Sequence, residues 1–159
     1  MMSIVLRSIL SLLFIGFLSQ VQAATPPKKE VASVEDVDLR ITAFDEIDRI
    51  FKALRFEVVN KRSTNREGAK EYSEQLVELS YLLPDTFNLP SSREIFPQSR
   101  SRPEIWSQKA RFDGLIDVFI GNLEQIDDLI KTGDLSKAGW LIDETAKGCR
   151  RCHNAYRYK

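Results

Sequence analysis

Two cysteines and the only histidine of the chain stand together as Cys149-Arg150-Arg151-Cys152-His153. This C-x-x-C-H spacing is the attachment signal for c-type haem. Two thiols add to the two vinyl groups of one porphyrin, and the adjacent imidazole reaches the iron as the axial ligand. Residues three and four positions apart share one side of a helix, so all three side chains are predicted to point into the core of the fold.

Other kinds of site use the same residue types. A structural or redox disulfide needs only Cys149 and Cys152, but a thioredoxin-like site expects a βαβ context that the helical pattern described below lacks. A zinc site needs about four ligands, and this motif supplies three, crowded into about one helical turn. We therefore predict one covalently attached haem c, with thioether bonds to Cys149 and Cys152 and with His153 on the iron.

Residues 1–23 have the features of a secretory signal peptide. They carry a positive charge at Arg7, an apolar run over residues 9–18 and a small-residue cleavage pattern at residues 21–23. The alternative is a membrane anchor, but the apolar run is about 10 residues long and a span needs about 20. Residues 24–33 are predicted to form a flexible leader. We expect a periplasmic protein that does not span the membrane after cleavage.

Composition indicates a single globular domain. The chain has 159 residues, 43% of them hydrophobic, with 23 basic and 23 acidic side chains and a formal net charge of zero. Domains of this size are common, and the apolar content is enough for a core. A nucleic-acid-binding protein that relies on a basic face is not expected from this balance.

Apolar residues recur every three or four positions in four segments of residues 34–159, which predicts four amphipathic helices. Ser33 is a plausible cap for the first helix, which extends to about Lys61. Residues 64–67 form a second capping-box pattern and open the second helix. Pro84 ends the second helix.

The third helix is predicted to start at residues 101–104 and to end at Gly133, and Asp134 caps the fourth. Residues 84–102 contain three prolines and form a long irregular connection. No segment shows sustained period-two alternation, so strands are not expected. The predicted fold is all-α, an antiparallel four-helix bundle with a long connection between helices 2 and 3.

The chain resembles the class II c-type cytochromes, the cytochrome c-prime family, over nearly its whole length after residue 23. The most specific similarity is CRRCHNAYR at residues 149–157. PEIW at residues 103–106 is similar to the start of the family's third helix, and LPDT at residues 83–86 to the exit of its second. Cytochrome c-prime is itself a standard example of a four-helix bundle, so the resemblance implies the same fold.

The resemblance also bears on the sixth coordination position of the iron. Low-spin electron carriers of the family place a methionine on the first helix as sixth ligand, and Phe44 aligns with that position here. The only methionines, Met1 and Met2, lie in the predicted signal peptide, and His153 is the only histidine. Met/His and bis-His ligation within the mature chain are thus excluded, which leaves a lysine, an asparagine or the α-amino group as unusual alternatives. Phe44 is either a lid over an open iron or an ordinary core residue.

Three further residues have roles implied by the resemblance. Arg40 either faces a haem propionate or is a solvated charge on the helix surface. Trp106 packs as a core residue beside the porphyrin. Arg157 matches the family's basic residue beside the proximal imidazole and influences the basicity of the histidine.

We consider three classes of function. The first is a periplasmic electron-transfer protein that cycles between Fe(III) and Fe(II) with a small redox-partner protein. The second is a gas-binding protein that captures NO or CO at a five-coordinate, high-spin iron. The third, a peroxidase-like enzyme, is disfavoured because no second histidine supplies distal acid-base chemistry. Pairing as a homodimer through the first two helices fits the resemblance.

Overall fold

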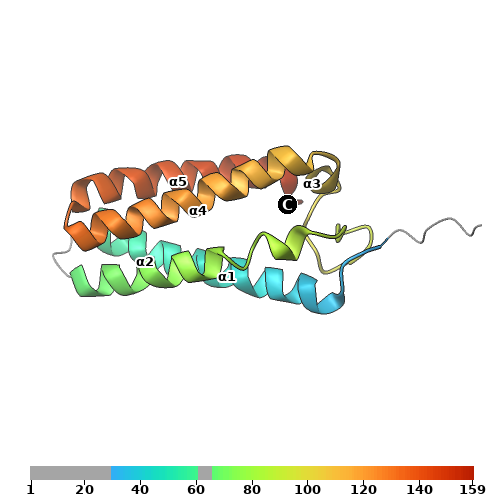
Figure 1. Cartoon of the computed structure of the whole chain (residues 1–159), viewed down its shortest axis with the longest axis horizontal. Coiled ribbons are helices and arrows are strands. Elements are labelled where there is room, and N and C mark those ends of the chain that lie inside the picture. Colours follow the sequence, from blue (N-terminus) through green and yellow to red (C-terminus); the bar gives the residue numbers. More distant parts are fainter. Residues whose placement is uncertain (1–29, 61–65) are drawn as a thin grey trace, which may run out of the picture.

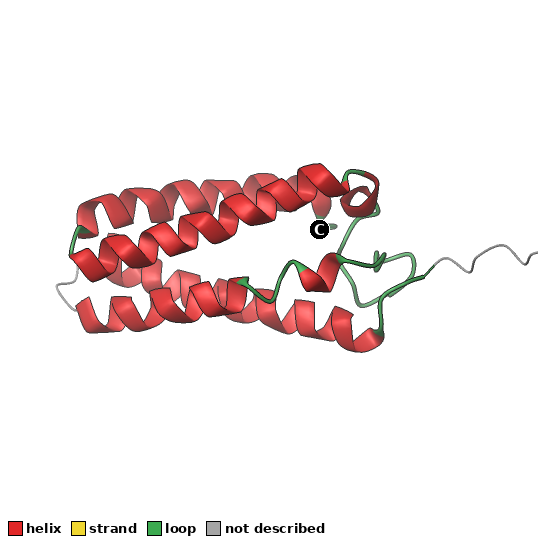
Figure 2. Cartoon of the chain, in the orientation of Figure 1, coloured by secondary structure: helices red, strands yellow, loops and turns green. Residues whose placement is uncertain are grey.

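The computed structural model describes residues 30–60 and 66–159, which form a helical bundle (Figure 1). The elements are, in chain order, α1 (Val34–Arg55), the π-helix η1 (Phe56–Asn60), α2 (Arg66–Ser80), the 3-10 turn η2 (Asp85–Phe87), α3 (Glu104–Ser107), α4 (Lys109–Thr132) and α5 (Leu135–Tyr156). The four long helices are α1, α2, α4 and α5. No strand occurs among the described residues (Figure 2). The predicted all-α four-helix bundle is confirmed.

The N-terminal predictions fall on a part of the chain that the structure does not describe. The signal peptide over residues 1–23 and residues 24–29 of the predicted leader lie outside the described residues. Within the described ranges, every helix is too short or too polar to cross a membrane.

The predicted caps at three helix ends are confirmed. At the start of α1, the Asp36 N–H donates to Ser33 Oγ at 3.1 Å, and the Ser33 N–H donates to Asp36 Oδ2 at 3.1 Å. Gly133 ends α4 with φ at 88°, a left-handed conformation that favours glycine. Asp134 Oδ1 then accepts the Lys137 N–H at 3.1 Å and caps α5. The capping box predicted over residues 64–67 begins outside the described residues.

The ends of two predicted helices differ in detail from the expectation. The first helix continues through Asn60, in agreement with a predicted end near Lys61, but its last part is the π-helix η1, which brings Val58 and Val59 against Gly139 of α5. The second ends at Ser80 instead of Leu83. The Leu83 N–H there donates to the Ser80 carbonyl in a tighter turn, at 3.1 Å, yet the Leu83 side chain is fully buried.

The third predicted helix is broken in two at Gln108, whose φ of −121° and ψ of 37° are not helical. The short α3 therefore lies apart from the axis of α4, at the end of the bundle (Figure 1). The Gln108 side chain accepts a hydrogen bond from the Tyr156 hydroxyl of α5 at 3.2 Å. The break thus places α3 and the adjoining connection next to the last turn of α5.

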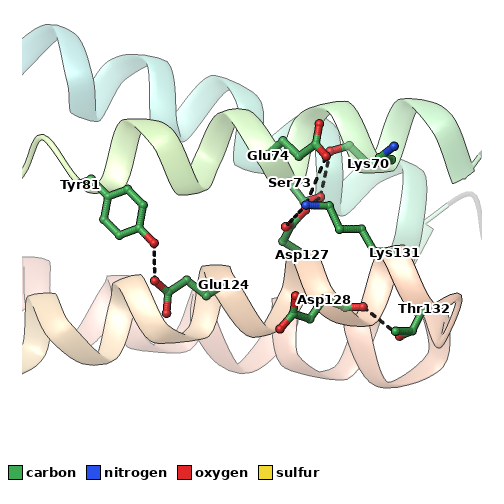
Figure 3. Close-up of polar contacts among 9 residues, drawn as sticks. All are labelled: Lys70, Ser73, Glu74, Tyr81, Glu124, Asp127, Asp128, Lys131 and Thr132. Carbon is green, nitrogen blue, oxygen red and sulfur yellow. Dashed lines mark hydrogen bonds and ion pairs between the residues drawn. The ribbon is translucent and has the colours of Figure 1, made fainter.

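Polar contacts fasten α2 to α4 (Figure 3). The buried Ser73 hydroxyl donates to Asp127 Oδ1 at 2.7 Å. Lys131 Nζ lies 2.6 Å from Asp127 Oδ2 and 3.2 Å from Glu74 Oε1. Around this network the core is closed by side chains that are at most 1% exposed, Leu54, Leu76, Ile126, Ile130 and Ile142.

Candidate haem site

The C-x-x-C-H motif occupies the last two turns of α5. Cys149 and Cys152 are half-buried free thiols, and Cys152 packs against the hydrophobic core. His153 is exposed, which differs from the expectation that all three side chains point into the core. Each helical residue is rotated by about 100° from the one before it, so His153 lies to the side of the line through Cys149, Cys152 and Tyr156.

Burial and charge set the protonation of these groups. Desolvation raises the pKa of the Cys149 and Cys152 thiols, so both are protonated at neutral pH. Partial desolvation and then the positive charge of Arg157 lower the pKa of His153. The neutral imidazole, which is the metal-binding form, therefore predominates at pH 7. Asp48 of α1 opposes this shift at His153, so α1 comes close to the motif.

Phe44 lies on α1 as a half-buried residue and meets the aromatic ring of Phe87 edge to face, with 6.2 Å between ring centroids. Phe87 belongs to η2 and is buried. It also contacts Phe112 of α4 at 4.7 Å, and Phe112 meets Tyr156 of α5 at 5.3 Å. A continuous row of rings therefore connects Phe44 with the turn of α5 that carries His153.

Phe87 is the residue in this region that sequence reasoning missed. It stands in the irregular connection, where no helical periodicity marks a residue as buried, and Pro84 ahead of it signals only the end of a helix. The Trp106 indole N–H donates to the Phe87 carbonyl at 3.0 Å, and the two rings lie 6.5 Å apart. Trp106 is half-buried against the core, as a packing residue should be.

Arg40 is buried, so its reading as a solvated surface charge is wrong. Its side chain is 3% exposed. The two terminal nitrogens donate four hydrogen bonds to the connection, to the Thr86 carbonyl (2.9 Å), the Ser91 hydroxyl (2.7 Å), the Ser91 carbonyl (3.2 Å) and the Ser99 hydroxyl (3.1 Å). The guanidinium also lies over the Phe87 ring, 4.7 Å from its centroid.

The energetic setting of Arg40 follows from these contacts. Desolvation lowers its pKa to about 10, which leaves the guanidinium charged at neutral pH. A buried charge is tolerated only when it is well hydrogen-bonded, and the connection supplies those acceptors. Arg40 therefore holds the irregular connection against α1 and fixes the position of Phe87.

Arg157 and His153 line the same open hollow, of about 290 Å³, together with Arg102, Asn154, Tyr158 and Lys159. The Arg157 N–H donates to the His153 carbonyl at 3.0 Å. Arg157 is exposed and forms an isolated antiparallel bridge with Ser101. The structure thus brings Arg157 beside His153, and it gathers Arg40, Phe44 and Trp106 around Phe87.

The motif offers two thiols and one imidazole as donor groups. Within the described residues, no group of three or more His, Cys, Asp or Glu side chains is arranged to hold a metal ion. The two cysteines are free rather than joined in a disulfide. Two protonated thiols separated by two residues, with a neutral imidazole directly after the second, fit the attachment of one porphyrin.

The sequence profile of the family described as Cytochrome C' matches residues 35–157. The chain belongs to the cytochrome c' family. Proteins of this family carry a covalently attached haem c, are periplasmic and typically transfer electrons or bind gases.

Individual relatives agree with this assignment. The chain is 30% identical to the cytochrome c' of Rubrivivax gelatinosus over 61 residues, which cover 38% of this chain and 47% of that protein. It is 36% identical over 59 residues to that of Alcaligenes xylosoxydans xylosoxydans, covering 37% and 46%. The chain therefore spans about half the length of the curated relatives it matches.

Solved structures share the fold over a longer range. The nitrosyl complex of a cytochrome c prime variant from Alcaligenes xylosoxidans superposes with a TM-score of 0.72 and 27% identity, covering 82% of this chain and 100% of that one.

Proposed function

We propose that this protein is a periplasmic monohaem cytochrome in which Cys149 and Cys152 hold the haem by thioether bonds and His153 binds its iron. When bound, haem c supplies a one-electron Fe(III)/Fe(II) couple. The chain's own contribution is to hold two thiols and one neutral imidazole on adjoining turns of α5, near Asp48 of α1. Family membership supports the cofactor, and the donor set supports the placement.

The observation that carries the proposed coordination is that Phe44 stands on α1 where the family resemblance puts the distal position. Phe44 offers no ligand atom, and Phe87 packs against it, which restricts its ring. The chain has one histidine, and its two methionines are Met1 and Met2. We therefore propose a five-coordinate, high-spin iron in a pocket walled by Phe44.

Three neighbouring residues have supporting roles in the proposal. Arg157, beside His153, favours the neutral imidazole through its charge. Trp106 completes the aromatic packing behind Phe87. Arg40 has both terminal nitrogens engaged by the connection, so any contact with a propionate would use its Nε–H.

An absorption spectrum of the ferrous holoprotein tests the coordination. We expect a broad high-spin band that changes when CO is added, because a five-coordinate iron has a position open to the gas. A sharp low-spin α-band that CO leaves unchanged would contradict the proposal.

The variant Phe44→Met tests the register of α1. A thioether at the distal position should convert the spectrum to low-spin, since methionine is a strong axial ligand in c-type cytochromes. Leu39→Met is the matched control, because Leu39 is an exposed residue of the same helix. A high-spin spectrum in both variants would show that Phe44 does not face the iron.

Gas binding is the second candidate function. It is favoured by the nitrosyl complex of the structural neighbour from Alcaligenes xylosoxidans and by the absence of a ligand atom on Phe44. Electron transfer predicts rapid, reversible reduction by a small redox protein. Gas capture predicts tight NO or CO binding, and titration of the ferrous protein with each gas measures it.

A further inference from the structure

Positive charge is concentrated at one end of this electrically neutral chain. Residues 145–159 contain five basic residues and no acidic ones. In α2 the balance is reversed, with four glutamates and two basic residues. The end of α5 is therefore locally basic, although the net charge of the chain is zero.

Backbone pairing brings more basic residues to this end. The Arg102 N–H donates to the Tyr156 carbonyl at 2.9 Å, and the Tyr158 N–H donates to the Arg100 carbonyl at 2.8 Å. Figure 1 shows the C-terminal residues next to α3. Because the two segments pair, side chains from the long connection and from the end of α5 share one surface.

This surface, the basic patch, consists of Arg93, Arg100, Arg102, Arg157 and Lys159. Tyr158 lies among them, with the Arg93 guanidinium 4.5 Å and the Arg102 guanidinium 5.4 Å from its ring centroid. Arg102, Arg157 and Lys159 of the patch line the same hollow as His153. The lining of this hollow contains no acidic side chain.

Nearby acidic groups neutralise the basic patch only in part. Glu104 pairs with Arg102 at 3.2 Å, and Glu94 accepts the Tyr158 hydroxyl at 2.7 Å. Asp45 and Asp48 of α1 act on Arg157 with favourable charge, while Arg100 acts on it with like charge. An anionic surface that approaches the basic patch would be attracted by the remaining positive charge.

We propose that the basic patch is the docking surface for an acidic one-electron redox protein, at the side of the molecule where His153 would hold the iron. This inference rests on the proposed electron-transfer function. In the complex one electron would pass from the partner to the haem held by Cys149, Cys152 and His153, reducing Fe(III) to Fe(II), and no bond would be made or broken. Charge complementarity raises the association rate by about 10-fold or more at low salt, and that gain falls as the Debye length shortens.

Stopped-flow reduction of the ferric holoprotein tests the proposal. The probes are a reduced plant-type [2Fe–2S] ferredoxin, as an acidic protein donor, and hexaammineruthenium(II), as a small cationic donor. The test variant is Arg100→Glu/Lys159→Glu, which changes exposed members of the patch and spares His153 and Arg157. The matched control is Lys70→Glu/Lys137→Glu, which makes the same change in charge near the starts of α2 and α5. Lys137 is about 30 Å along α5 from Arg157, and therefore far from the patch.

We expect the test variant to lower the second-order rate constant for ferredoxin about 10-fold at about 0.02 M salt, and this difference to vanish near 0.5 M. Hexaammineruthenium(II) should reduce the test variant at least as fast as wild type. The control variant should change the ferredoxin rate less than about 2-fold. If both variants lowered the ferredoxin rate constant equally, or if that rate constant did not depend on salt, the proposed docking surface would be wrong.

The ruthenium reaction separates the two levels of inference. One outcome is that hexaammineruthenium(II) reduces the wild-type protein at a normal rate while the rate constant for ferredoxin depends neither on salt nor on the charge substitutions. In that case the docking surface alone is wrong. If neither donor reduces the iron, the proposed electron-transfer function is wrong as well.

Discussion

The two ends of the bundle are built on different principles. At the turn end, where Gly133 and Asp134 join α4 to α5, apolar side chains close the core and the Asp127 network fastens α2 to α4. At the haem end, the thiols are half-buried, His153 is exposed, and α1 has little direct contact with α5. One wall there belongs to an irregular segment that Arg40 holds in place.

The difference shows which part of the fold stands without a cofactor. Among the described residues, the buried side-chain polar atoms without a hydrogen-bond partner are Arg102 Nε and Glu104 Oε2, and neither lies at the turn end. The haem end has its ligand atoms at the margin of the core, where a porphyrin would add the missing apolar contacts. Changes at the turn end should therefore lower stability without altering the bound haem, whereas changes at the haem end can affect both.

The largest effect is expected from Cys149→Ala/Cys152→Ala. Without thiols no thioether bond forms, so acidic organic solvent should extract all of the haem, and the haem end should be poorly ordered. Mass spectrometry of the intact protein measures the covalent adduct. Cys149→Ala alone is the control, since it leaves one thiol to form one bond. A covalent haem adduct in the double variant would refute the assignment.

Arg40→Met should lower the free energy of unfolding by about 3 kcal/mol, because the Thr86 and Ser91 carbonyls lose a charged donor inside the protein. Urea unfolding measures the loss, and hydrogen exchange should locate it in the connection. Arg49→Met removes an exposed arginine from the same helix and should change stability by less than about 0.5 kcal/mol. Similar losses in both would mean that Arg40 does not anchor the connection.

A turn-end change, Asp127→Ala, should cost about 2 kcal/mol, because Ser73 loses its buried acceptor and Lys131 loses a partner. The spectrum of the bound haem should stay unchanged. Asp128→Ala, at the adjacent exposed position in Figure 3, is the control and should cost far less. If Asp127→Ala altered the spin state, the two ends would not be independent.

The smallest effect is expected from Asp134→Ala, which removes the cap of α5. Hydrogen bonding to Lys137 lowers the pKa of Asp134 below its ordinary 3.8. A carboxylate with a lowered pKa adds stability that is complete above the ordinary value and is lost as the pH falls through the lowered one. The variant should therefore unfold at slightly lower urea at pH 7, and the two proteins should converge in strong acid. A constant difference across that range would mean that the charged cap is not responsible.

The parts that could be predicted from the sequence depend on local signals. Ser33, Gly133 and Asp134 mark helix ends through residues next to them in the chain. The C-x-x-C-H motif likewise lies within about one helical turn, so Cys149, Cys152 and His153 can be recognised as candidate haem residues without knowledge of the fold.

What could not be predicted depends on distant partners. Arg40 bonds to residues 46 to 59 positions away, so nothing near it in the sequence distinguishes a buried arginine from a solvated one. Phe87 is buried by rings from α1, α3 and α4. The helix break at Gln108 coincides with a hydrogen bond from Tyr156, 48 residues away, which no local propensity encodes.

The pairing of the long connection with the end of α5 also has a kinetic consequence. Tyr158 and Glu94, which this pairing brings together, are 64 residues apart. Contacts of such separation form late, because the entropy of loop closure opposes them until the rest of the chain is ordered. Helices α4 and α5, joined by a two-residue turn, can associate much earlier. During folding, we therefore expect the connection to pair with Tyr156 and Tyr158 only after α4 and α5 have associated.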